Sequence, residues 1–312
     1  MVYISSFRRK EIKYLLNEQQ YKKILGYIIK NYASIDEYGE SSINNIYFDT
    51  PDFKLVRTSL DKPVYKEKLR LRTYGATTDS TNAFIEIKKK YKGIVYKRRI
   101  SAPYKNALDY LTFQNTYDKN GIKNKFENYD IDINGTENAK HTEHDELNRE
   151  IKAEIDAFLE YYKNLVPRMA VTYKRTALVG REDPGLRFTF DRDIRWRVED
   201  IDLRNNTEVN EKGEEILSQG EHLMEVKVPA AFPIGLSREF SEMGVFPVSI
   251  SKYGRGYTAY RQELFQELIP NQEGTLEFDR DRRAGFAAVV RNEIQLNCKK
   301  SGIVKGKTVS DL

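Results

Sequence analysis

The sequence predicts an α+β protein in which an antiparallel eight-stranded β-barrel forms a tunnel and helices lie around its outside. Three observations predict this fold. Eight segments alternate between apolar and polar residues, which is the period of a β-strand, whereas only a few segments show helical spacing. The polar positions of these segments also repeat Lys and Arg, and a barrel can gather such side chains in its interior.

Turn-forming stretches separate several of the alternating segments, so the strands can be placed in order. The expected strands cover residues 9–16, 43–48, 66–74, 83–90, 94–101, 168–178, 186–197 and 222–228.

Apolar residues at helical spacing predict helices over 17–31 and 144–163, and less regular patterns predict helices over 51–60, 234–243 and 254–268. We expect Asn17 to cap the first helix, and Thr50 to cap the short helix that begins at Pro51.

The composition narrows the class of protein. The chain has 312 residues, enough for a sizeable core, and its one cysteine, Cys298, excludes a disulfide scaffold. No apolar stretch approaches the roughly 18 residues of a membrane-spanning helix, and the opening residues MVYISSFRRKEIKY lack the apolar segment of a secretory signal. We therefore expect a cytoplasmic protein without an integral membrane segment. We expect one domain over residues 1–268 and a C-terminal extension, partly helical or disordered, over residues 269–312.

The formal net charge of +5 is unevenly distributed along the chain. Residues 115–150 carry nine acidic and five basic residues, and residues 199–221 carry eight acidic and two basic residues. The rest of the chain therefore carries a net charge of +15. We interpret the two acidic segments as solvated loops, because both are rich in Asn, Gly and Asp.

The charged positions of the expected strands share common faces. Lys68, Arg70 and Arg72 alternate with Leu69 and Leu71. One interpretation is an ordinary sheet whose charged face lies in water. The other is a barrel whose apolar faces pack outward and whose basic lumen binds a polyanion such as a chain of phosphates. Further pairs on common faces are Glu11 and Lys13, Glu86 and Lys88, Lys97 and Arg99, Arg187 and Asp191, and Glu225 and Lys227.

Glu225 has two interpretations on this pattern. A carboxylate among phosphates is suited to hold Mg²⁺ or Mn²⁺, which bridge protein and phosphate oxygens. The alternative is an ion pair with a neighbouring Arg. Nucleic-acid binding is not expected, because the basic residues follow strand alternation and do not form an exposed patch with aromatic platforms.

Eight short motifs, taken in order, resemble a known family. Together they resemble the polyphosphate polymerase domain of the VTC (vacuolar transporter chaperone) family, within the triphosphate tunnel metalloenzymes, over residues 7–260. The motifs are Glu-Ile-Lys-Tyr (11–14), Tyr-Phe-Asp-Thr (47–50), Lys-Leu-Arg-Leu-Arg-Thr-Tyr-Gly (68–75), Glu-Ile-Lys-Lys-Lys (86–90), Tyr-Lys-Arg-Thr-Ala (173–177), Arg-Phe-Thr-Phe-Asp (187–191), Met-Glu-Val-Lys (224–227) and Ser-Lys-Tyr (251–253).

This resemblance implies a tunnel-shaped antiparallel barrel that transfers the ATP γ-phosphate to a growing inorganic polyphosphate chain with the help of Mn²⁺ or Mg²⁺. It implies Glu225 as the metal ligand and Lys97, Lys252 and, as a further candidate, Arg99 as phosphate-binding residues. The residues that it implies as catalytic are Lys13, Arg70, Arg72, Lys88, Arg175, Arg187 and Lys227.

The chain departs from the family pattern in three respects. Arg9 stands where the wider superfamily has the first Glu of a Glu-x-Glu-x-Lys motif, which fits the polymerase branch better than the hydrolase branch. Lys252 is a single lysine where relatives often have two close together. We also expect neither the phosphate-sensing SPX domain nor the membrane helices of eukaryotic relatives.

We therefore expect an ATP-dependent polyphosphate polymerase with ATP and inorganic polyphosphate as its partners. The closest alternative is a tripolyphosphatase or nucleoside triphosphatase in the same tunnel, and a polyphosphate-binding module without catalysis is a further alternative. The end phosphate of a chain is already an oxyanion, so transfer needs no His or Cys base. We interpret His141, His144 and His222 as surface or supporting residues and Cys298 as inert.

Overall fold

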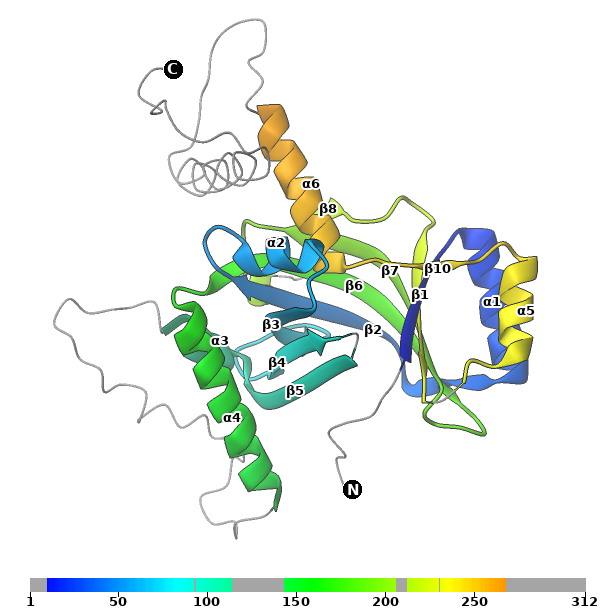
Figure 1. Ribbon diagram of the computed structural model, residues 1–312, viewed down its shortest axis with the longest axis horizontal. Helices are drawn as coiled ribbons and strands as arrows, with labels where there is room; N and C mark the ends of the chain where they lie inside the picture. The colour runs from blue at the N-terminus through cyan, green and yellow to red at the C-terminus, as the bar shows by residue number, and fades with distance from the viewer. Residues whose placement is uncertain (1–9, 93, 114–142, 206–211, 230, 268–312) are drawn as a thin grey trace, which may run out of the picture.

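The computed structural model describes residues 10–92, 94–113, 143–205, 212–229 and 231–267. These residues form an α+β fold around one antiparallel sheet (Figure 1). The strand order is β10-β1-β9-β7-β6-β2-β3-β4-β5, and β8 pairs with β7. The expected extension over 269–312, with Cys298, lies outside the described residues, as does His141.

The strands are β1 (Lys10–Leu16), β2 (Ala33–Asp49), β3 (Tyr65–Tyr74), β4 (Asn82–Tyr91), β5 (Ile94–Pro103), β6 (Val166–Gly180), β7 (Arg187–Arg197), β8 (Glu214–Glu215), β9 (His222–Val228) and β10 (Pro247–Val248). The helices are α1 (Glu18–Asn31), α2 (Lys54–Leu60), α3 (Tyr104–Phe113), α4 (Glu143–Tyr162), α5 (Ile234–Glu242) and α6 (Lys252–Glu267), and a 3₁₀ turn, η2, covers Leu203–Asn205.

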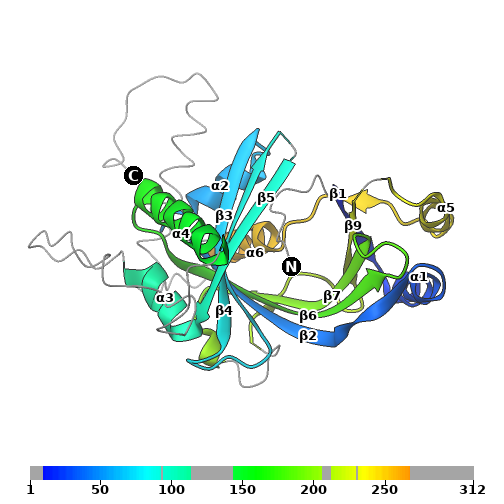
Figure 2. The ribbon, with the colours of Figure 1, turned by 90° about the horizontal axis from the view of Figure 1, so that it is seen from below.

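The sheet is not closed within the described residues, so the prediction of an eight-stranded barrel is not confirmed. Two strands of two residues each, β8 and β10, bring the sheet to ten strands. Within the described residues, β5 and β10 are the two edges and do not pair with each other. The sheet nevertheless curves strongly: β3, β4 and β5 form one wall, β2, β6 and β7 the base, and β1 and β9 the other wall (Figure 2). Alternation determines which face of a strand is charged, but it carries no information on whether the edge strands meet.

The eight expected strands all occur, and the antiparallel α+β class is confirmed. The largest difference is in β2, which begins at Ala33 because it continues past a register shift to pair with the end of β6. The helix expected from Asn17 is also confirmed, since the Asn17 side chain accepts from the Gln20 backbone amide and the Gln20 side-chain oxygen accepts from the Asn17 backbone amide.

Two helix predictions differ from the structure. The short helix α2 begins at Lys54 rather than at Pro51, and Phe53, in a left-handed conformation, stands at its N-cap instead of the expected Thr50. The Thr50 hydroxyl accepts a hydrogen bond from the Lys54 amide at 2.9 Å. The Asp49 carboxylate accepts hydrogen bonds from the Leu55 and Val56 amides at 2.8 and 3.0 Å. Asp49, although it precedes the helix, thus provides acceptors for amides of the first turn. Helix α3 was not expected, because it follows β5 directly and no turn-forming stretch separates the two.

The apolar faces of the strands pack outward against helices. Leu69 and Leu71 of β3 and Ile85 of β4 share one buried cluster with residues of α3 and α4. Phe188 of β7 and Val226 of β9 belong to a second cluster, which includes residues of α1 and α5. The concave side of the sheet, called the inner face below, therefore receives the charged residues of the same strands. No helix in the described ranges is long and apolar enough to cross a membrane.

Helix α6 packs against one end of the inner face. The Tyr253 ring stacks on the Tyr47 ring of β2 at 4.4 Å between centroids, with an interplanar angle of 4°. A Cβ atom at Gly256 would lie 2.8 Å from the Met169 sulfur and 3.1 Å from Trp196, so only glycine allows this close approach of helix and sheet. The start of α6 is thereby held over the inner face, and this start carries Lys252.

Candidate functional site

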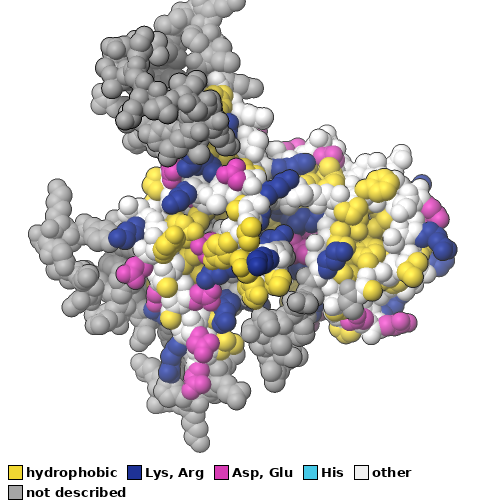
Figure 3. Space-filling view, viewed as in Figure 1, with side chains coloured by type: hydrophobic (Ala, Val, Ile, Leu, Met, Phe, Trp, Pro, Cys, Tyr) yellow, Lys and Arg dark blue, Asp and Glu magenta, His cyan; other side chains and the backbone are white. Residues whose placement is uncertain are grey.

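Lys and Arg side chains gather along the concave side of the sheet. Figure 3 looks toward this side and shows dark blue side chains in the recess between the two walls, with magenta carboxylates among them. They come from strands on both walls and on the base, and from the start of α6. The inner face is therefore a charged surface shared by segments that are far apart in the sequence.

Glu225 of β9 lies at the centre of one charge cluster, in which three cations surround it. Its Oε1 contacts the Lys13 ammonium of β1 and lies 3.2 Å from the Lys252 Nζ of α6. Its Oε2 lies 3.6 Å from Nη2 of Arg175 on β6. The pairing of β1 with β9 places Lys13 directly opposite Glu225, so the register itself builds this contact.

Asp191 of β7 is a second carboxylate of the same cluster, and its side chain is fully buried. Arg175 donates to it in a bidentate manner, with Nε at 2.5 Å from Oδ1 and Nη2 at 2.7 Å from Oδ2. The Lys252 ammonium lies 2.6 Å from Oδ2. Arg175 and Lys252 thus each contact both carboxylates, and such bidentate, charge-assisted contacts are the stronger class of hydrogen bond.

The ionisation of this cluster follows from two opposing effects. Burial would raise the pKa of Glu225, but Lys252, Lys13 and Arg175 outweigh it and hold the pKa well below its usual range. Burial would likewise raise the pKa of Asp191, and Arg175 and Lys252 lower it. Burial would lower the pKa of Lys252, but Asp191 and Glu225 raise it above its ordinary value. All of these groups are therefore charged at neutral pH.

Glu86 of β4 forms the centre of a second cluster, on the opposite wall. Its carboxylate is 1% exposed and lies 2.6 Å from Nε of Arg70. It also contacts the Lys97 ammonium and lies 3.9 Å from Nε of Arg72. Burial lowers the pKa of Lys97 to about 7 despite the Glu86 carboxylate beside it. Three cations therefore surround one carboxylate in this cluster.

Arg70 and Arg72 also contact the base of the curved sheet. Arg70 Nη1 donates to the Tyr47 hydroxyl at 3.4 Å, and Arg72 Nη2 donates to the Tyr173 hydroxyl at 3.2 Å. Burial would raise the pKa of both phenols, but the neighbouring cations lower it, Arg70 for Tyr47 and Arg72 for Tyr173. The two guanidinium groups are therefore held in fixed positions over the inner face.

Glu11 of β1 links the two walls. It lies 3.0 Å from Lys13 of its own strand and 3.8 Å from Lys88 of β4. Burial would raise the pKa of Glu11, but Lys88 and Lys13 lower it to about 2. The contact with Lys88 shows that the walls approach closely enough for side chains to meet across the inner face.

The structure brings most of the expected site residues together on one face. Lys13, Arg175, Lys252 and Glu225 form one cluster, and Arg70, Arg72 and Lys97 form the other, with Lys88 between them.

Three expected residues lie at the margins of these clusters. Arg187 is exposed at the start of β7, and its Nε donates to the Pro184 carbonyl at 3.2 Å. Lys227 is its direct neighbour across the strand pair, and burial lowers the pKa of Lys227. Arg99 lies opposite Glu86 in the pairing of β4 with β5, with its guanidinium 4.7 Å from the centroid of the Phe84 ring.

Four charged side chains of the inner face are not among the expected site residues: Asp191, Glu86, Glu11 and Lys68. The alternation of the strands already put them on the charged faces, so the signal was present in the sequence. Our interpretation assigned the faces to cations with one or two carboxylates among them, and only Glu225 was given a role, whereas the structure has several buried carboxylates that pair with the cations.

His222 does not belong to the inner face. It is buried on the outer side of β9, where its ring stacks on Tyr21 at 3.8 Å and its Nε2 lies 2.7 Å from the Glu18 carboxylate. It therefore supports the packing of α1, in line with the interpretation as a supporting rather than a surface residue. The side chain of His144 lies outside the described part of the structure.

The inner face offers few protein ligands for a metal ion. Among the described residues, no group of three or more His, Cys, Asp or Glu side chains could hold one. The Thr189 hydroxyl, however, lies directly opposite Glu225, is buried, and has no hydrogen-bond partner in the described structure. An unpartnered buried hydroxyl beside a carboxylate fits a bound group that supplies the missing contact. A divalent cation with one carboxylate and several phosphate or water oxygens is the coordination that Mg²⁺ commonly accepts.

The fold and this face together define an α+β protein whose curved antiparallel sheet is suited to bind a polyanion. The VTC domain family matches residues 8–261, and the chain belongs to this family.

The solved structures that resemble this chain share little sequence identity with it and superpose on it poorly. The PH1819 protein from Pyrococcus horikoshii OT3 is 12% identical, with 82% of this chain and 99% of that chain covered and a TM-score of 0.38. An adenylate cyclase described as putative, from Vibrio parahaemolyticus, is 9% identical, with 80% and 98% covered and a TM-score of 0.37. The Mediator head module of Schizosaccharomyces pombe gives 7% identity, 84% and 96% coverage and a TM-score of 0.33. No curated protein matches the chain.

Proposed function

We propose that this protein is an ATP-dependent polyphosphate polymerase that transfers the γ-phosphate of ATP to the end of an inorganic polyphosphate chain bound on the inner face. Membership of the VTC domain family supports a phosphate-related function. The observation that carries the proposal is the cluster around Glu225, where partly buried cations from β1, β6 and α6 converge on one carboxylate.

The charge balance of the inner face supports binding of a polyanion. Glu225 and Asp191 balance two of the three positive charges of Lys13, Arg175 and Lys252, so this cluster keeps an excess of one positive charge. A phosphate chain offers the same cations more oxygens, and Arg contacts phosphate in a bidentate manner while Lys acts as a point charge. The cations are thereby preorganised, because the carboxylates hold them in place before the phosphates arrive.

Phosphoryl transfer needs mainly alignment of the reacting groups and neutralisation of charge. In the proposal, Arg70, Arg72, Lys88 and Arg187 hold the triphosphate of ATP, and Lys13 and Arg175 neutralise the charge that moves to the leaving group. Lys97, Arg99, Lys227 and Lys252 bind further phosphates. A Mn²⁺ or Mg²⁺ ion, held by Glu225, would supply additional charge neutralisation at the transferred phosphate.

The attacking group in this reaction is the terminal oxygen of the bound chain, which carries its negative charge already. The protein therefore has to orient this oxygen and exclude water rather than remove a proton. Exclusion of water decides between products, because water in place of the chain would turn the same site into a tripolyphosphatase or nucleoside triphosphatase.

Product analysis tests the proposal. The purified protein is incubated with ATP and Mn²⁺ or Mg²⁺, and the products are resolved on a gel that detects polyphosphate. We expect ADP together with long chains. Orthophosphate without chains would contradict polymerase activity in favour of hydrolysis, and binding of polyphosphate without turnover would contradict both enzymatic functions.

Glu225→Gln is the matching variant, and it should abolish turnover while ATP binding persists. Glu242→Gln removes a carboxylate from an exposed position of α5 and should leave turnover unchanged. Normal turnover of Glu225→Gln would overturn the role assigned to this carboxylate.

A further inference from the structure

Two pairs of lysines lie on the inner face of β3 and β4. In the register of the two strands, Lys66 is directly opposite Lys90, and Lys68 is directly opposite Lys88. Side chains at such positions have Cβ atoms about 5 Å apart, and like charges directly opposite each other are destabilising. We call these four residues the lysine ladder. Repulsion between these lysines lowers the stability of the folded protein, and the pairing of β3 with β4 does not require lysine at these positions.

The next row shows how the sheet neutralises such charges elsewhere. There, Arg70 is opposite Glu86, and the two form an ion pair of 2.6 Å. In the ladder, by contrast, Lys88 has a carboxylate only at 3.8 Å, that of Glu11. Among the described residues, Lys66, Lys68 and Lys90 have no carboxylate within ion-pair distance.

Neutral oxygens partly satisfy the two lysines of β3. The Lys68 ammonium donates to the Ser251 hydroxyl at 2.9 Å, next to the start of α6, and the Lys66 ammonium donates to the Ser59 carbonyl of α2 at 3.1 Å. Burial, together with Lys88 and Lys66, lowers the pKa of Lys68 to about 8, although Tyr47 opposes this shift. Burial, Lys90 and Lys62 also lower the pKa of Lys66. Three of the four ladder lysines therefore have no carboxylate partner among the described residues, and the fourth, Lys88, has one at 3.8 Å.

The ladder continues the row of Arg70 and Arg72 toward the turn between β4 and β5. From Arg72 to Lys66, the inner face of β3 extends about 20 Å, at about 3.3 Å per residue. A single triphosphate is shorter than this row and cannot contact both ends at once. A ligand that uses the full row must be a longer chain of phosphates.

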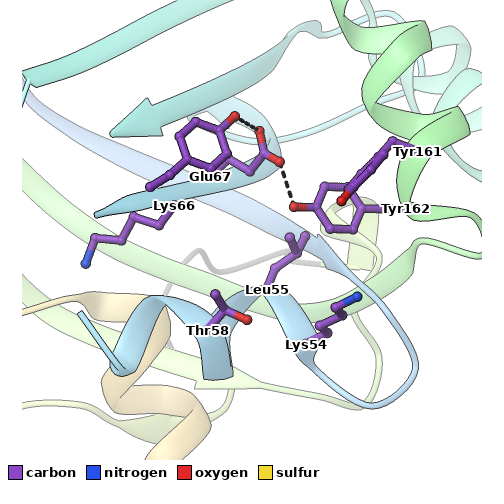
Figure 4. A pocket seen from close by; sticks show the side chains of 8 residues that line it. Lys54, Leu55, Thr58, Lys66, Glu67, Tyr161 and Tyr162 are labelled. Atoms are coloured by element: carbon purple, nitrogen blue, oxygen red, sulfur yellow. Dashed lines mark hydrogen bonds between the residues drawn. The ribbon is translucent and has the colours of Figure 1, made fainter. Parts of the chain in front are cut away.

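The ladder ends beside a cavity of about 120 Å³ between α2, β3 and α4, which Lys66 borders (Figure 4). This cavity contains Glu67, whose two carboxylate oxygens accept from the Tyr65 and Tyr162 hydroxyls at 2.5 and 2.6 Å. A carboxylate at its wall makes the cavity a poor phosphate site. An anion that follows the ladder should therefore leave the protein at Lys66 and Lys90 rather than enter this cavity.

We propose that Lys66, Lys68 and Lys90 of the lysine ladder bind the distal phosphates of a linear inorganic polyphosphate chain whose reacting end lies near Glu225. Lys88, which is assigned to the triphosphate of ATP, stands where the ladder meets the triphosphate site. The identity of the chain rests on the proposed function, but the binding itself does not require turnover. The ladder thereby distinguishes long chains from triphosphates, and it holds a growing chain on the enzyme between successive transfers.

Equilibrium binding without ATP tests this inference. The double variant Lys66→Ala/Lys90→Ala is titrated with tripolyphosphate and with polyphosphate of several tens of phosphates. The matched control is Lys23→Ala/Lys30→Ala, which removes the same charge from exposed positions of α1, on the other side of the molecule (Figure 1).

We expect the ladder variant to bind long polyphosphate at least about tenfold more weakly, with a salt dependence reduced by about two phosphate contacts. Its affinity for tripolyphosphate should change less than twofold, and the control should match the wild type for both ligands. Lys66→Arg/Lys90→Arg keeps the charge and should restore long-chain binding. A thermal melt should show the alanine variant folded, because the substitution relieves repulsion.

Undiminished long-chain affinity of the folded alanine variant would overturn the ladder proposal, whatever the enzymatic assay shows. An equal loss for tripolyphosphate and the long chain would also overturn it, because the lysines would then belong to the triphosphate site. If the wild type binds long chains through the ladder but makes no polyphosphate, the ladder stands and the polymerase proposal fails.

Discussion

Replacing Asp191 by Asn tests whether buried carboxylates balance the cations of the unliganded inner face. The substitution keeps the shape of the side chain and removes its charge. Asp191 is fully buried and contacts Arg175 at 2.5 and 2.7 Å and Lys252 at 2.6 Å. Asn can accept only weaker hydrogen bonds, so Arg175 and Lys252 would be left with Glu225, which Lys13 also contacts, as their charged partner.

The expected magnitude follows from this geometry. Breaking a buried ion pair by removing one partner costs about 3–5 kcal/mol, because the remaining charge is left uncompensated. For a domain of this size, 1 kcal/mol corresponds to a shift in melting temperature of about 2–4 °C. Asp191→Asn should therefore lower the melting temperature by roughly 6–20 °C.

Asp193→Asn is a control on the same strand with the same change of charge. Asp193 lies at the surface, where it contacts Arg192 at 2.5 Å and Lys174 at 3.8 Å. Its positive φ of 50° is one that Asn adopts readily. Exposed ion pairs contribute about 0–1 kcal/mol, so this variant should melt within about 3 °C of the wild type.

Scanning calorimetry with and without tripolyphosphate completes the experiment. Because Asp191→Asn removes a negative charge from the site, the anion should bind this variant more tightly and raise its melting temperature by more than it raises that of the wild type. Equal melting temperatures of the Asp191 and Asp193 variants would refute the charge-balance argument, as would a smaller effect of tripolyphosphate on Asp191→Asn.

Three further predictions concern single side chains. Tyr253→Phe removes the hydrogen bond of 2.8 Å to the buried Asp49 carboxylate and should lower the free energy of unfolding in urea by about 1–3 kcal/mol; an unchanged midpoint would contradict the anchoring of α6. Arg187→Ala and Arg70→Ala should both weaken tripolyphosphate binding in calorimetric titrations. Only Arg70→Ala, which strips an ion pair from a buried carboxylate, should also lower the melting temperature, so equal melts would argue against this difference. The affinity for polyphosphate should fall as the pH rises from 7 to 9, because burial lowers the pKa of Lys97 to about 7 and that of Lys68 to about 8, and the neutral amines no longer attract phosphate. Lys68→Arg should flatten this pH profile, and an unchanged profile would exclude Lys68 as its source.

Strand alternation predicted which residues share the inner face. Arg70 and Arg72 do lie on the charged side of β3, and Leu69 and Leu71 do pack outward against helices. This succeeded because the side-chain period of a strand is independent of its neighbours. The same independence explains why the closure of the sheet could not be predicted.

The ion partners of the site residues could not be read from the sequence. Glu86 neutralises Arg70 because the pairing of β3 with β4 places the two opposite each other, and a register shifted by one residue would separate them. Lys252 reaches Glu225 and Asp191 because α6 packs closely against the sheet at Gly256. Both facts depend on tertiary structure, whereas the residue types themselves were visible as motifs.

The fate of the γ-phosphate tests the central claim most directly. The protein is incubated with γ-labelled ATP and Mn²⁺, and label in polyphosphate and in orthophosphate is counted against the ADP formed. We predict one labelled phosphate in polyphosphate for each ADP, and neither product with Glu225→Gln. Label that appears only as orthophosphate, or equal label transfer by Glu225→Gln, would contradict the account.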